Sequence, residues 1–377
     1  MPRPLRIEPV VNRYQRRDWL EMPWKVNAGD PCWVPPLRDM QRRQAGFASH
    51  PVWDGAERQA YLAMRGPEPV GRILAIENRV HNEHAEDKTG FFGFFECFDD
   101  AEAAAELFSA AEEWLRGRGL TASRGPMNPT LNYEFGTLIE GFDTPPYFLL
   151  THNPPYYQRL IENAGYGKVQ DMYAYRGDIS MLDSLSKDKK LLTVDQMVRE
   201  RFGVTVRPMR LRHFREEVET FLDLYNRAMD HNWGHVPMTR AEVVHFAKDL
   251  KQLLVPELAR IAEVDGKPVG CVFGLLDYNP RIKAIDGRLF PFGWVRLLRN
   301  KKSLSRIRMV STNVLPEYQS WGVGVCLSVS LLEPALSHGV TDCEFSWILE
   351  TNDLSRKTVE KGGALRYKTW RVFEKAL

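Results

Sequence analysis

Apolar positions near the carboxyl end of the chain follow two different spacings. The run from Arg308 to Leu315 is rich in apolar residues and is typical of a strand. The run from Val325 to His338 is typical of a helix, because apolar residues recur there at helical spacing, at Leu327, Leu331, Leu332 and Ala335. A loop with two glycines, Gln319 to Gly324, separates the two runs. The pattern predicts a strand, a glycine loop and a helix in succession.

This succession of elements is suited to holding phosphate groups. Glycine lacks a Cβ, so the backbone at Gly322 and Gly324 is able to approach a ligand and to take positive φ values. The free N–H groups of the first helical turn point at an anion, and the helix dipole favours its negative charge. An ordinary turn is the alternative interpretation of so short a glycine pattern.

A second pattern occurs twice along the chain. A strand–turn–strand unit is expected at 59–76 and again at 259–273, and Pro-Val-Gly stands at 69 and at 268, which are 199 positions apart (268 minus 69). A helix end before a glycine recurs at 162–165 and 360–363, offset by 198 (360 minus 162). Two anchors with nearly equal offsets predict a duplicated α/β (α+β) domain, at 1–180 with an N-terminal extension and at 194–377. The linker is expected near 180–193.

Composition narrows the class of protein. The 377 residues are 44% hydrophobic and 27% charged with a net charge of +2, which is a globular profile and gives no case for nucleic acid. No apolar stretch has the length of a signal peptide core or of a membrane span, which needs about 18 residues. We expect a soluble cytoplasmic protein, at most peripheral at the inner membrane face. Five widely spaced cysteines indicate reduced thiols, and the histidines show no metal-binding spacing, so no metal is expected.

Two linked motifs resemble those of the GNAT superfamily of acyl-CoA N-acyltransferases. The first is Gln-x-x-Gly-x-Gly after a strand, at Gln319 to Gly324. The second is a strand-ending Asn352, a small residue three positions later, Ser355, and a glycine eleven positions later, Gly363. The resemblance implies two tandem GNAT-like domains, each a mixed, mostly antiparallel sheet flanked by helices, with acyl-CoA as co-substrate. It implies coenzyme A contacts from Val314, Leu315, Gln319, Ser320, Trp321, Gly322, Val323, Gly324, Asn352 and Ser355.

The first half differs at the corresponding place. Where the second half has the glycine loop, the first has Cys97 to Glu102, with two aspartates and a glutamate at a helix start. These acids compensate the helix dipole and would repel a pyrophosphate. We therefore expect coenzyme A to bind only the second half, beside a degenerate first half. Since two fused domains already form a pseudo-dimer, we expect a monomer.

The candidate catalytic residues follow from the chemistry of N-acyl transfer. The amine must lose a proton, and the leaving thiolate must gain one. GNAT proteins often supply that proton from a tyrosine seven residues after the motif asparagine, but this position is Val359 here. The candidate bases are Glu350, His231 and His235. For the acceptor we expect Asn128, Asn132 and Glu134, from loops dense in Gly, Pro and Asn, together with Trp233, Phe292 and Trp294.

A basic and apolar insert separates two expected strands of the second half. Residues 281–308 contain nine Lys and Arg, one acid, and several aromatic and leucine residues. Such a mixture suits an anionic membrane surface, and equally a lid over an acyl chain or a solvated basic hairpin.

The whole pattern resembles the tandem GNAT acyltransferases that include the ceramide-forming enzymes of sphingoid bases. It implies transfer of a long acyl chain to a lipid amine. The alternatives are an acetyltransferase for a small polar amine or peptide, and a non-catalytic acyl-CoA-binding protein.

Overall fold

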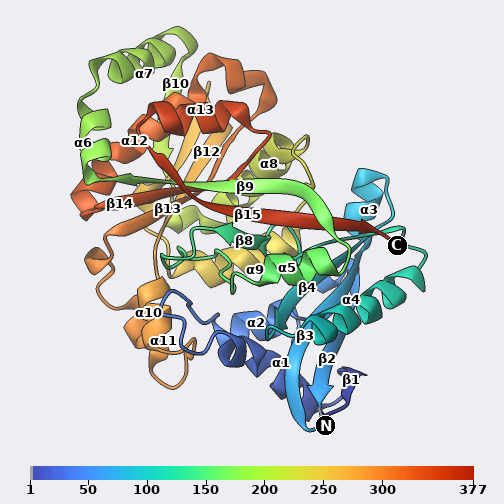
Figure 1. Ribbon diagram of the computed structural model, residues 1–377. Helices are drawn as coiled ribbons and strands as arrows, with labels where there is room; N and C mark the ends of the chain where they lie inside the picture. The colour runs from blue at the N-terminus through green and yellow to red at the C-terminus, as the bar shows by residue number, and fades with distance from the viewer. Residues whose placement is uncertain (1–2) are drawn as a thin grey trace. The chain divides into compact units, whose positions relative to one another are not determined.

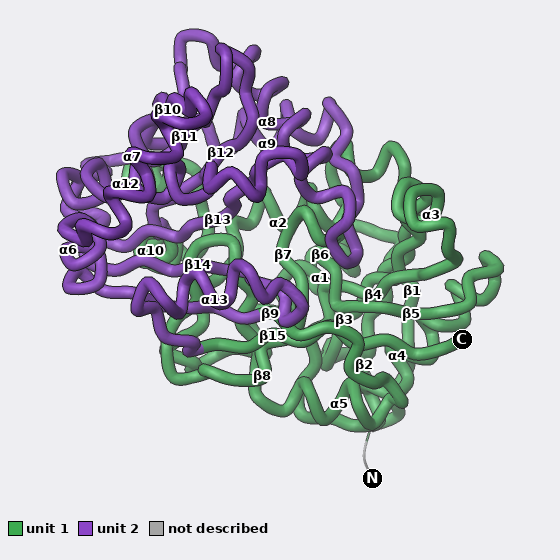
Figure 2. Tube along the Cα trace, turned by 90° about the horizontal axis from the view of Figure 1, so that it is seen from above, with its two compact units in different colours: residues 1–172, 279–297, 368–377 green, residues 173–278, 298–367 purple. Residues whose placement is uncertain are grey.

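The chain divides into two compact units (Figure 2). The computed structural model describes residues 3–377. Unit 1 contains the chain up to Met172 together with 279–297 and 368–377, and unit 2 contains 173–278 and 298–367. Two segments from the second half of the sequence therefore belong to unit 1. The boundaries of the two units therefore differ from the predicted ones, 1–180 and 194–377. The second repeat is contiguous in sequence, but its segments 279–297 and 368–377 belong to unit 1.

Unit 1 is built on a mixed sheet (Figure 1). Neighbouring strands are antiparallel except β4 and β5, which run parallel. β8 (Thr137–Glu140) also pairs with β15, and β6 (Met127–Asn128) forms a separate two-stranded ribbon with β7 (Glu134–Phe135). The strand order in the main sheet is β1 (Leu5–Pro9), β2 (Ala56–Arg65), β3 (Glu68–Asn78), β4 (Thr89–Cys97), β5 (Ala122–Gly125) and β15 (Leu365–Ala376).

The core of unit 1 lies between this sheet and α4 (Ala101–Arg116), which packs against β2 and β3. Phe92 and Phe108 meet edge to face at 5.1 Å in this core. Asp100 caps α4 by accepting a hydrogen bond from the amide of Ala103 at 3.0 Å, and the helix ends at Gly117. The other helices of unit 1 are α1 (Arg13–Val26), α2 (Arg38–Gln44), α3 (Arg79–Ala85), α5 (Tyr157–Asn163), α10 (Asn279–Ala284) and most of α11 (Gly293–Leu298).

Unit 2 repeats this plan. Its parallel pair is β13 and β14, and the pairs β10–β11, β11–β12 and β12–β13 are antiparallel. The strand order is β9 (Gly167–Asp178), β14 (Asp342–Leu349), β13 (Arg306–Val314), β12 (Lys267–Leu276), β11 (Ala259–Val264) and β10 (Val204–Pro208). The helices are α6 (Ile179–Lys187), α7 (Lys189–Phe202), α8 (Phe214–Met229), α9 (Arg240–Lys251), α12 (Val323–His338) and α13 (Asp353–Lys361).

The predicted duplication extends to the register of the strands. Leu5 faces Arg65 in unit 1, and Val204 faces Val264 in unit 2, which places both partners 199 positions later. The register shift in the first hairpin follows Ala63 and the shift in the second follows Ala262, again 199 positions apart. Residues 5–44 thus supply the strand and two helices that correspond to β10, α8 and α9. They are part of the repeated fold, and not the N-terminal extension that we predicted.

The stretch predicted as a linker, 180–193, is helical. Asp178 caps α6 and Asp188 caps α7, each by accepting two backbone N–H groups. Val198 on α7 then packs into a core with Val323 and Leu327 of α12. This stretch therefore forms two capped helices instead of an irregular linker.

The five cysteines are all free, as their spacing predicted. Burial raises the pKa of four of them, Cys97, Cys271, Cys326 and Cys343, to about 12. Across residues 3–377 no helix has the length and hydrophobicity that crossing a membrane requires. In the same part of the chain, no three His, Cys, Asp or Glu side chains gather as ligands for a metal ion.

Candidate functional site

The glycine loop of unit 2 leads directly into the start of a helix. A 3₁₀ turn over Pro316–Trp321 precedes α12, which begins at Val323, two residues before the predicted start. Gly322 has φ of +87°, and a Cβ there would lie 2.9 Å from Cγ2 of Val198. A Cβ on Gly324 would meet nothing within 4 Å. Gly322 is thus required by the backbone, whereas Gly324 leaves room at the first helical turn.

The first turn of α12 differs electrostatically from that of α4 in unit 1. In the described chain no side chain caps α12, and its first turn holds no acidic residue. At α4, Asp100 caps the helix and Arg65 donates to Asp100 at 2.7 Å, which holds the pKa of that carboxyl below its usual value. The dipole of α12 therefore remains available to an anion, whereas that of α4 is already compensated.

The parallel strands beside the loop also diverge in unit 2. β13 pairs with β14 from Arg306 opposite Asp342 as far as Met309 opposite Phe345. β13 then continues to Val314 and β14 to Leu349 without further ladder pairs between them in the described residues. The register between β12 and β13 shifts at the same level, after Phe273. Diverging strands with unshared backbone groups suit an extended ligand arm.

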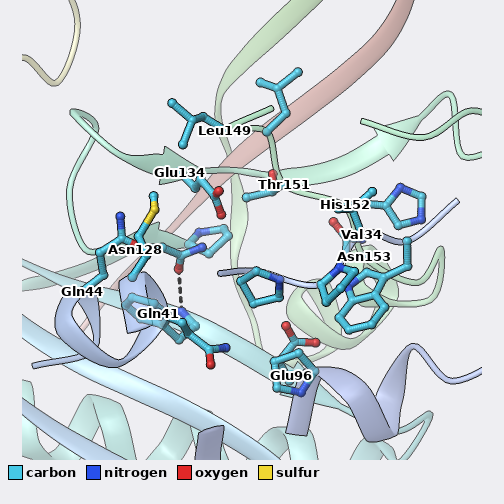
Figure 3. A pocket seen from close by; sticks show the side chains of 18 of the residues that line it. Val34, Gln41, Gln44, Glu96, Asn128, Glu134, Leu149, Thr151, His152 and Asn153 are labelled. Atoms are coloured by element: carbon cyan, nitrogen blue, oxygen red, sulfur yellow. Dashed lines mark hydrogen bonds between the residues drawn. The ribbon is translucent and has the colours of Figure 1, made fainter. Parts of the chain in front are cut away.

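In unit 1 the chain itself fills the corresponding place, between β4 and β5. β4 and β5 pair only from Thr89 to Phe91 and from Ala122 to Arg124. Beyond them a Cβ on Gly93 would lie 1.7 Å from the carbonyl oxygen of Met127. The amide of Phe94, which has φ of +50°, donates to Oδ1 of Asn128 at 2.6 Å (Figure 3). An arm cannot enter here without displacing residues 127–128.

The remaining residues predicted for coenzyme A shape the loop. Gln319 donates to the carbonyl of Val314 at 3.1 Å, and Trp321 stacks on Phe202 of α7 at 4.6 Å. Leu315 is buried and Ser320 is exposed. In the second motif, Oδ1 of Asn352 accepts a hydrogen bond from the amide of Ser355 at 3.0 Å and caps α13.

The three candidate bases lie in different environments of unit 2. Glu350 stands in the half-buried turn between β14 and Asn352. His231 and His235 lie between α8 and α9, as does Trp233. The side chain of His231 is 89% exposed, whereas His235 is buried with its ring 5.9 Å from that of Tyr225. The two histidines therefore differ in their exposure to water, although they lie in the same short loop.

The residues predicted for the acceptor are dispersed. Asn128 and Glu134 line a cavity of about 130 Å³ inside unit 1 (Figure 3), and Asn132 lies in the turn between them without lining it. Phe292 and Trp294 are 73% and 49% exposed. Trp233 belongs to unit 2.

The basic insert belongs to unit 1 up to Leu297. Asp286 accepts hydrogen bonds from Nε1 of Trp24 at 2.6 Å and Nη2 of Arg38 at 3.0 Å, and the carbonyl of Gly287 accepts the amide of Arg38. The insert folds as α10 and α11, so the hairpin considered for it is wrong. Its outer residues are exposed apolar side chains, Phe290, Phe292, Trp294 and Val295.

Sequence reasoning missed two charged residues of the unit 1 cavity, Arg72 and Glu96. His152 and Tyr157, which also line it, lie in one of the loops that we expected to form the acceptor side. The sequence did contain a signal, since Glu96 is the one acid within the aromatic run 90–98. Side chains alternate between the two faces of a strand, so this charge lies on one face of a strand that is otherwise largely aromatic. Nothing in the sequence, however, places Arg72 or Asp30 beside that run.

No family model matches the sequence. The chain is 36% identical to "Bacterial ceramide synthase" of Caulobacter vibrioides, with 99% of this chain and 98% of that protein covered. It is 35% identical to "Protein YghO" of Escherichia coli, with 98% and 95% covered. Among solved structures, a tandem GNAT protein from the clavulanic acid biosynthesis pathway matches with a TM-score of 0.58 at 13% identity, covering 99% and 98%. A GCN5-related N-acetyltransferase from Sphaerobacter thermophilus matches with a TM-score of 0.52 at 13% identity, covering 99% and 95%.

The structural matches establish the fold, which is that of tandem GNAT proteins, and so confirm the predicted fold class. The full-length sequence matches go further, because they cover nearly the whole of both chains. The protein is therefore a member of the tandem GNAT acyltransferase family that includes the bacterial ceramide synthase of Caulobacter vibrioides.

Proposed function

We propose that the protein transfers a long acyl chain from coenzyme A to the amine of a sphingoid base and so forms a ceramide. The observation that carries this proposal is the full-length similarity to a bacterial ceramide synthase. The uncapped α12 and the diverging β13 and β14 support it, since a donor thioester needs a phosphate site beside an extended arm.

Acyl-CoA is assigned to unit 2. The amides of Gly322, Val323 and Gly324 face the pyrophosphate in this proposal, while Gln319 and Trp321 fix the loop and Asn352 with Ser355 fixes the start of α13. Val314 ends the strand that would accompany the pantetheine arm, and Leu315 follows it directly. The corresponding place in unit 1 is filled by Met127 and Asn128, so one coenzyme A per chain is expected.

The chemistry requires an uncharged amine to attack the thioester carbon, with the thiolate as leaving group. Glu350 and His235 remain the candidates in unit 2 that would receive the amine proton. His231 is the weakest candidate, because a side chain that is 89% exposed offers no shielded path for a proton. With Val359 in place of a tyrosine, the thiolate leaves unassisted or is protonated from elsewhere.

The test is a product assay. Purified protein is incubated with acyl-CoAs from acetyl to palmitoyl and with sphinganine, and the products are identified by mass spectrometry. N-acylsphinganine from long-chain donors only is the expected result. Donor consumption with acetyl-CoA and a polar amine alone would favour the acetyltransferase. If a folded protein binds acyl-CoA but consumes none, the binding-protein alternative replaces the enzyme.

We also propose that the insert contacts an anionic membrane. Phe290 is 81% exposed and Phe292 73% exposed, on a segment in which Arg and Lys outnumber acids. Apolar side chains of this size gain about 1.5–3 kcal/mol each on leaving water, and basic residues attract anionic lipid.

The double variant F290D/F292D is therefore expected to bind phosphatidylglycerol vesicles roughly 100-fold more weakly in sedimentation assays. Leu354→Asp is the matched control, because Leu354 is 72% exposed in unit 2, outside the insert. Equal binding by wild type and the double variant would remove the membrane from the proposal without affecting the transferase.

A further inference from the structure

A carboxylate is buried at the point where β13 and β14 diverge in unit 2. Glu344 is 0% exposed and lies opposite Arg308, in the last ladder pair but one before the two strands separate. Oε1 of Glu344 accepts a hydrogen bond from the hydroxyl of Ser346 at 2.6 Å, and Oε2 accepts one from the hydroxyl of Tyr367. Both oxygens of this carboxylate are therefore hydrogen-bonded to hydroxyl groups.

Arg308 supplies the positive charge of the cluster. Its side chain is buried, and its Nε donates to Oγ of Ser346 at 2.9 Å, while its Nη2 donates to the carbonyl of the same residue at 3.3 Å. Burial raises the pKa of Glu344, with a contribution from the charge of Asp277, and the opposing effects of Arg308 and the two hydroxyl donors do not cancel this rise. Glu344 is thus a stronger base than an exposed glutamate.

The duplicated fold does not require charges at this position. Counted back from the last ladder pair, the places of Arg308 and Glu344 are taken in unit 1 by Gly90 and Ser123. The ladder between β4 and β5 stops one pair later all the same. Buried opposite charges often stabilise a fold less than apolar residues of similar size do. The charges in unit 2 therefore point to chemistry, since buried acids with perturbed pKa values are typical of functional sites.

The cluster lies at the end of the path proposed for the donor arm. The proposed pyrophosphate site follows β13, which ends at Val314, and the ladder between β13 and β14 stops at Met309. From Met309 to Val314 the strand is roughly 17 Å long, at about 3.3 Å per residue, and an extended pantetheine arm spans such a length. The thioester of an arm laid along β13 thus reaches the level of Arg308 and Ser346.

We propose that Tyr367 and Glu344 relay the proton of the amine acceptor during acyl transfer. The inference rests on the proposed function and adds another candidate in unit 2 to Glu350 and His235. Tyr367 is the outer member of the relay, because its side chain is half-buried whereas Glu344 is buried completely. Tyr367 is accordingly the catalytic residue that meets the amine, and Glu344 acts through it.

The relay returns to its starting state in each turnover. The lone pair of the neutral amine forms the C–N bond, the nitrogen proton passes to the hydroxyl oxygen of Tyr367, and the tyrosine's own proton passes to Glu344. The C–S bond then breaks with its electron pair on sulfur. The proton on Glu344 returns through Tyr367 to the thiolate, so a tyrosine in place of Val359 is not needed.

The test is the variant Tyr367→Phe, which removes only the hydroxyl. Release of coenzyme A and formation of the acylated product are both measured, with the amine that the wild type accepts. We expect kcat to fall roughly 100-fold, as on loss of a general acid–base group, while KM for acyl-CoA changes by less than about twofold. Tyr175→Phe is the matched control and should keep the wild-type kcat, because Tyr175 also donates to a glutamate of unit 2, Glu360 on α13, at 2.9 Å.

Glu344→Gln and the double variant Y367F/E344Q test whether the two residues act as a unit. Each single variant should lower kcat to a similar degree, and the double variant should be within about twofold of either, because members of one relay are not additive. Unfolding midpoints and calorimetric titration with coenzyme A show for each variant that the fold and the donor site are intact. If Glu344→Gln does not fold, the comparison of Tyr367→Phe with Tyr175→Phe still decides.

The relay and the proposed function fail in different ways. Wild-type kcat in Tyr367→Phe, an equal loss in Tyr175→Phe, or losses that multiply in the double variant would overturn the relay while the function stands. A wild type that acylates only a small polar amine, and that Tyr367→Phe slows, would support the relay and remove the sphingoid acceptor. A wild type that consumes no acyl-CoA with any amine would overturn both.

Discussion

The variant Gly324→Asp is expected to lose affinity for coenzyme A on the order of 100-fold while remaining folded. A side chain at this position enters space in which no atom lies within 4 Å, so the substitution introduces no clash. Its carboxylate would lie at the first turn of α12, where the proposal places the pyrophosphate. The negative charges of the carboxylate and the pyrophosphate would then repel each other at close range.

The free energy of unfolding of Gly324→Asp is expected to increase, although its affinity for coenzyme A falls. α12 has neither a side-chain cap nor an acid in its first turn, and an acid near a helix N-terminus typically stabilises by about 0.3–1 kcal/mol. Replacing a helical glycine adds further stability. Calorimetric titration with coenzyme A and thermal unfolding measure the two quantities on one sample.

Gly324→Ala separates charge from bulk, since it adds only the Cβ that the space accommodates. We expect it to keep most of the affinity and to gain stability. If Gly324→Asp bound coenzyme A as tightly as wild type does, the pyrophosphate would have to lie elsewhere and the assignment of unit 2 as the donor site would be lost.

The variant Arg72→Met is expected to lower the free energy of unfolding by about 3–5 kcal/mol, the usual result of removing one partner from a buried ion pair. Arg72 is 2% exposed, and its loss leaves Glu96 charged beneath the cavity and the carbonyl of Trp19 without this donor. Urea unfolding measures the change. Arg17→Met is the control, because that side chain is 69% exposed and its pair with Asp18 should contribute less than about 1 kcal/mol.

The double variant R72M/E96Q distinguishes the ion pair from simple packing. Without the buried charge of Glu96, the loss of Arg72 should cost much less, so the two substitutions together should destabilise less than their sum. Strict additivity would show that Arg72 acts through its contacts with the ring and the carbonyl of Trp19, and not through Glu96.

The decrease in the free energy of unfolding caused by Arg72→Met should also depend on pH. Burial raises the pKa of Glu96, and Arg72 is the main group that opposes this rise. A carboxyl whose pKa is raised in the folded state favours folding below its unfolded pKa, and this advantage is lost as the pH rises through the folded value. Without Arg72 the folded pKa rises further, so the variant should be closer to wild type at about pH 5 than at about pH 8.

Local patterns predicted the repeated fold well. The Pro-Val-Gly pair marked hairpins whose register agrees at the same offset of 199, because a tight turn fixes the pairing of its flanking strands. The helix start at the two aspartates, of which Asp100 is the cap, was found because capping depends on a few neighbouring residues. The glycine loop was located for the same reason, although α12 starts two residues earlier than its apolar spacing indicated.

Features that depend on distant residues were missed. The exchange of 279–297 into unit 1 rests on Asp286 meeting Trp24 and Arg38, which are about 250 positions away in sequence. The cavity is similar, since Asp30 and His152 come together across 122 positions. Hydrophobic spacing reports the face of one element and carries no information about which distant side chains that face will meet.

The membership of residues 368–377 in unit 1 has a consequence for how the protein is made. Trp370, Val372 and Phe373 are completely buried, and Trp370 donates to the carbonyl of Thr151 at 3.0 Å. A ribosome adds these residues only after all of unit 2, at about 5–20 residues per second. During synthesis of unit 2, the nascent first half therefore waits with an unfilled place in its sheet and apolar surface in water. The interval in which a chaperone can bind the chain is set by the length of unit 2.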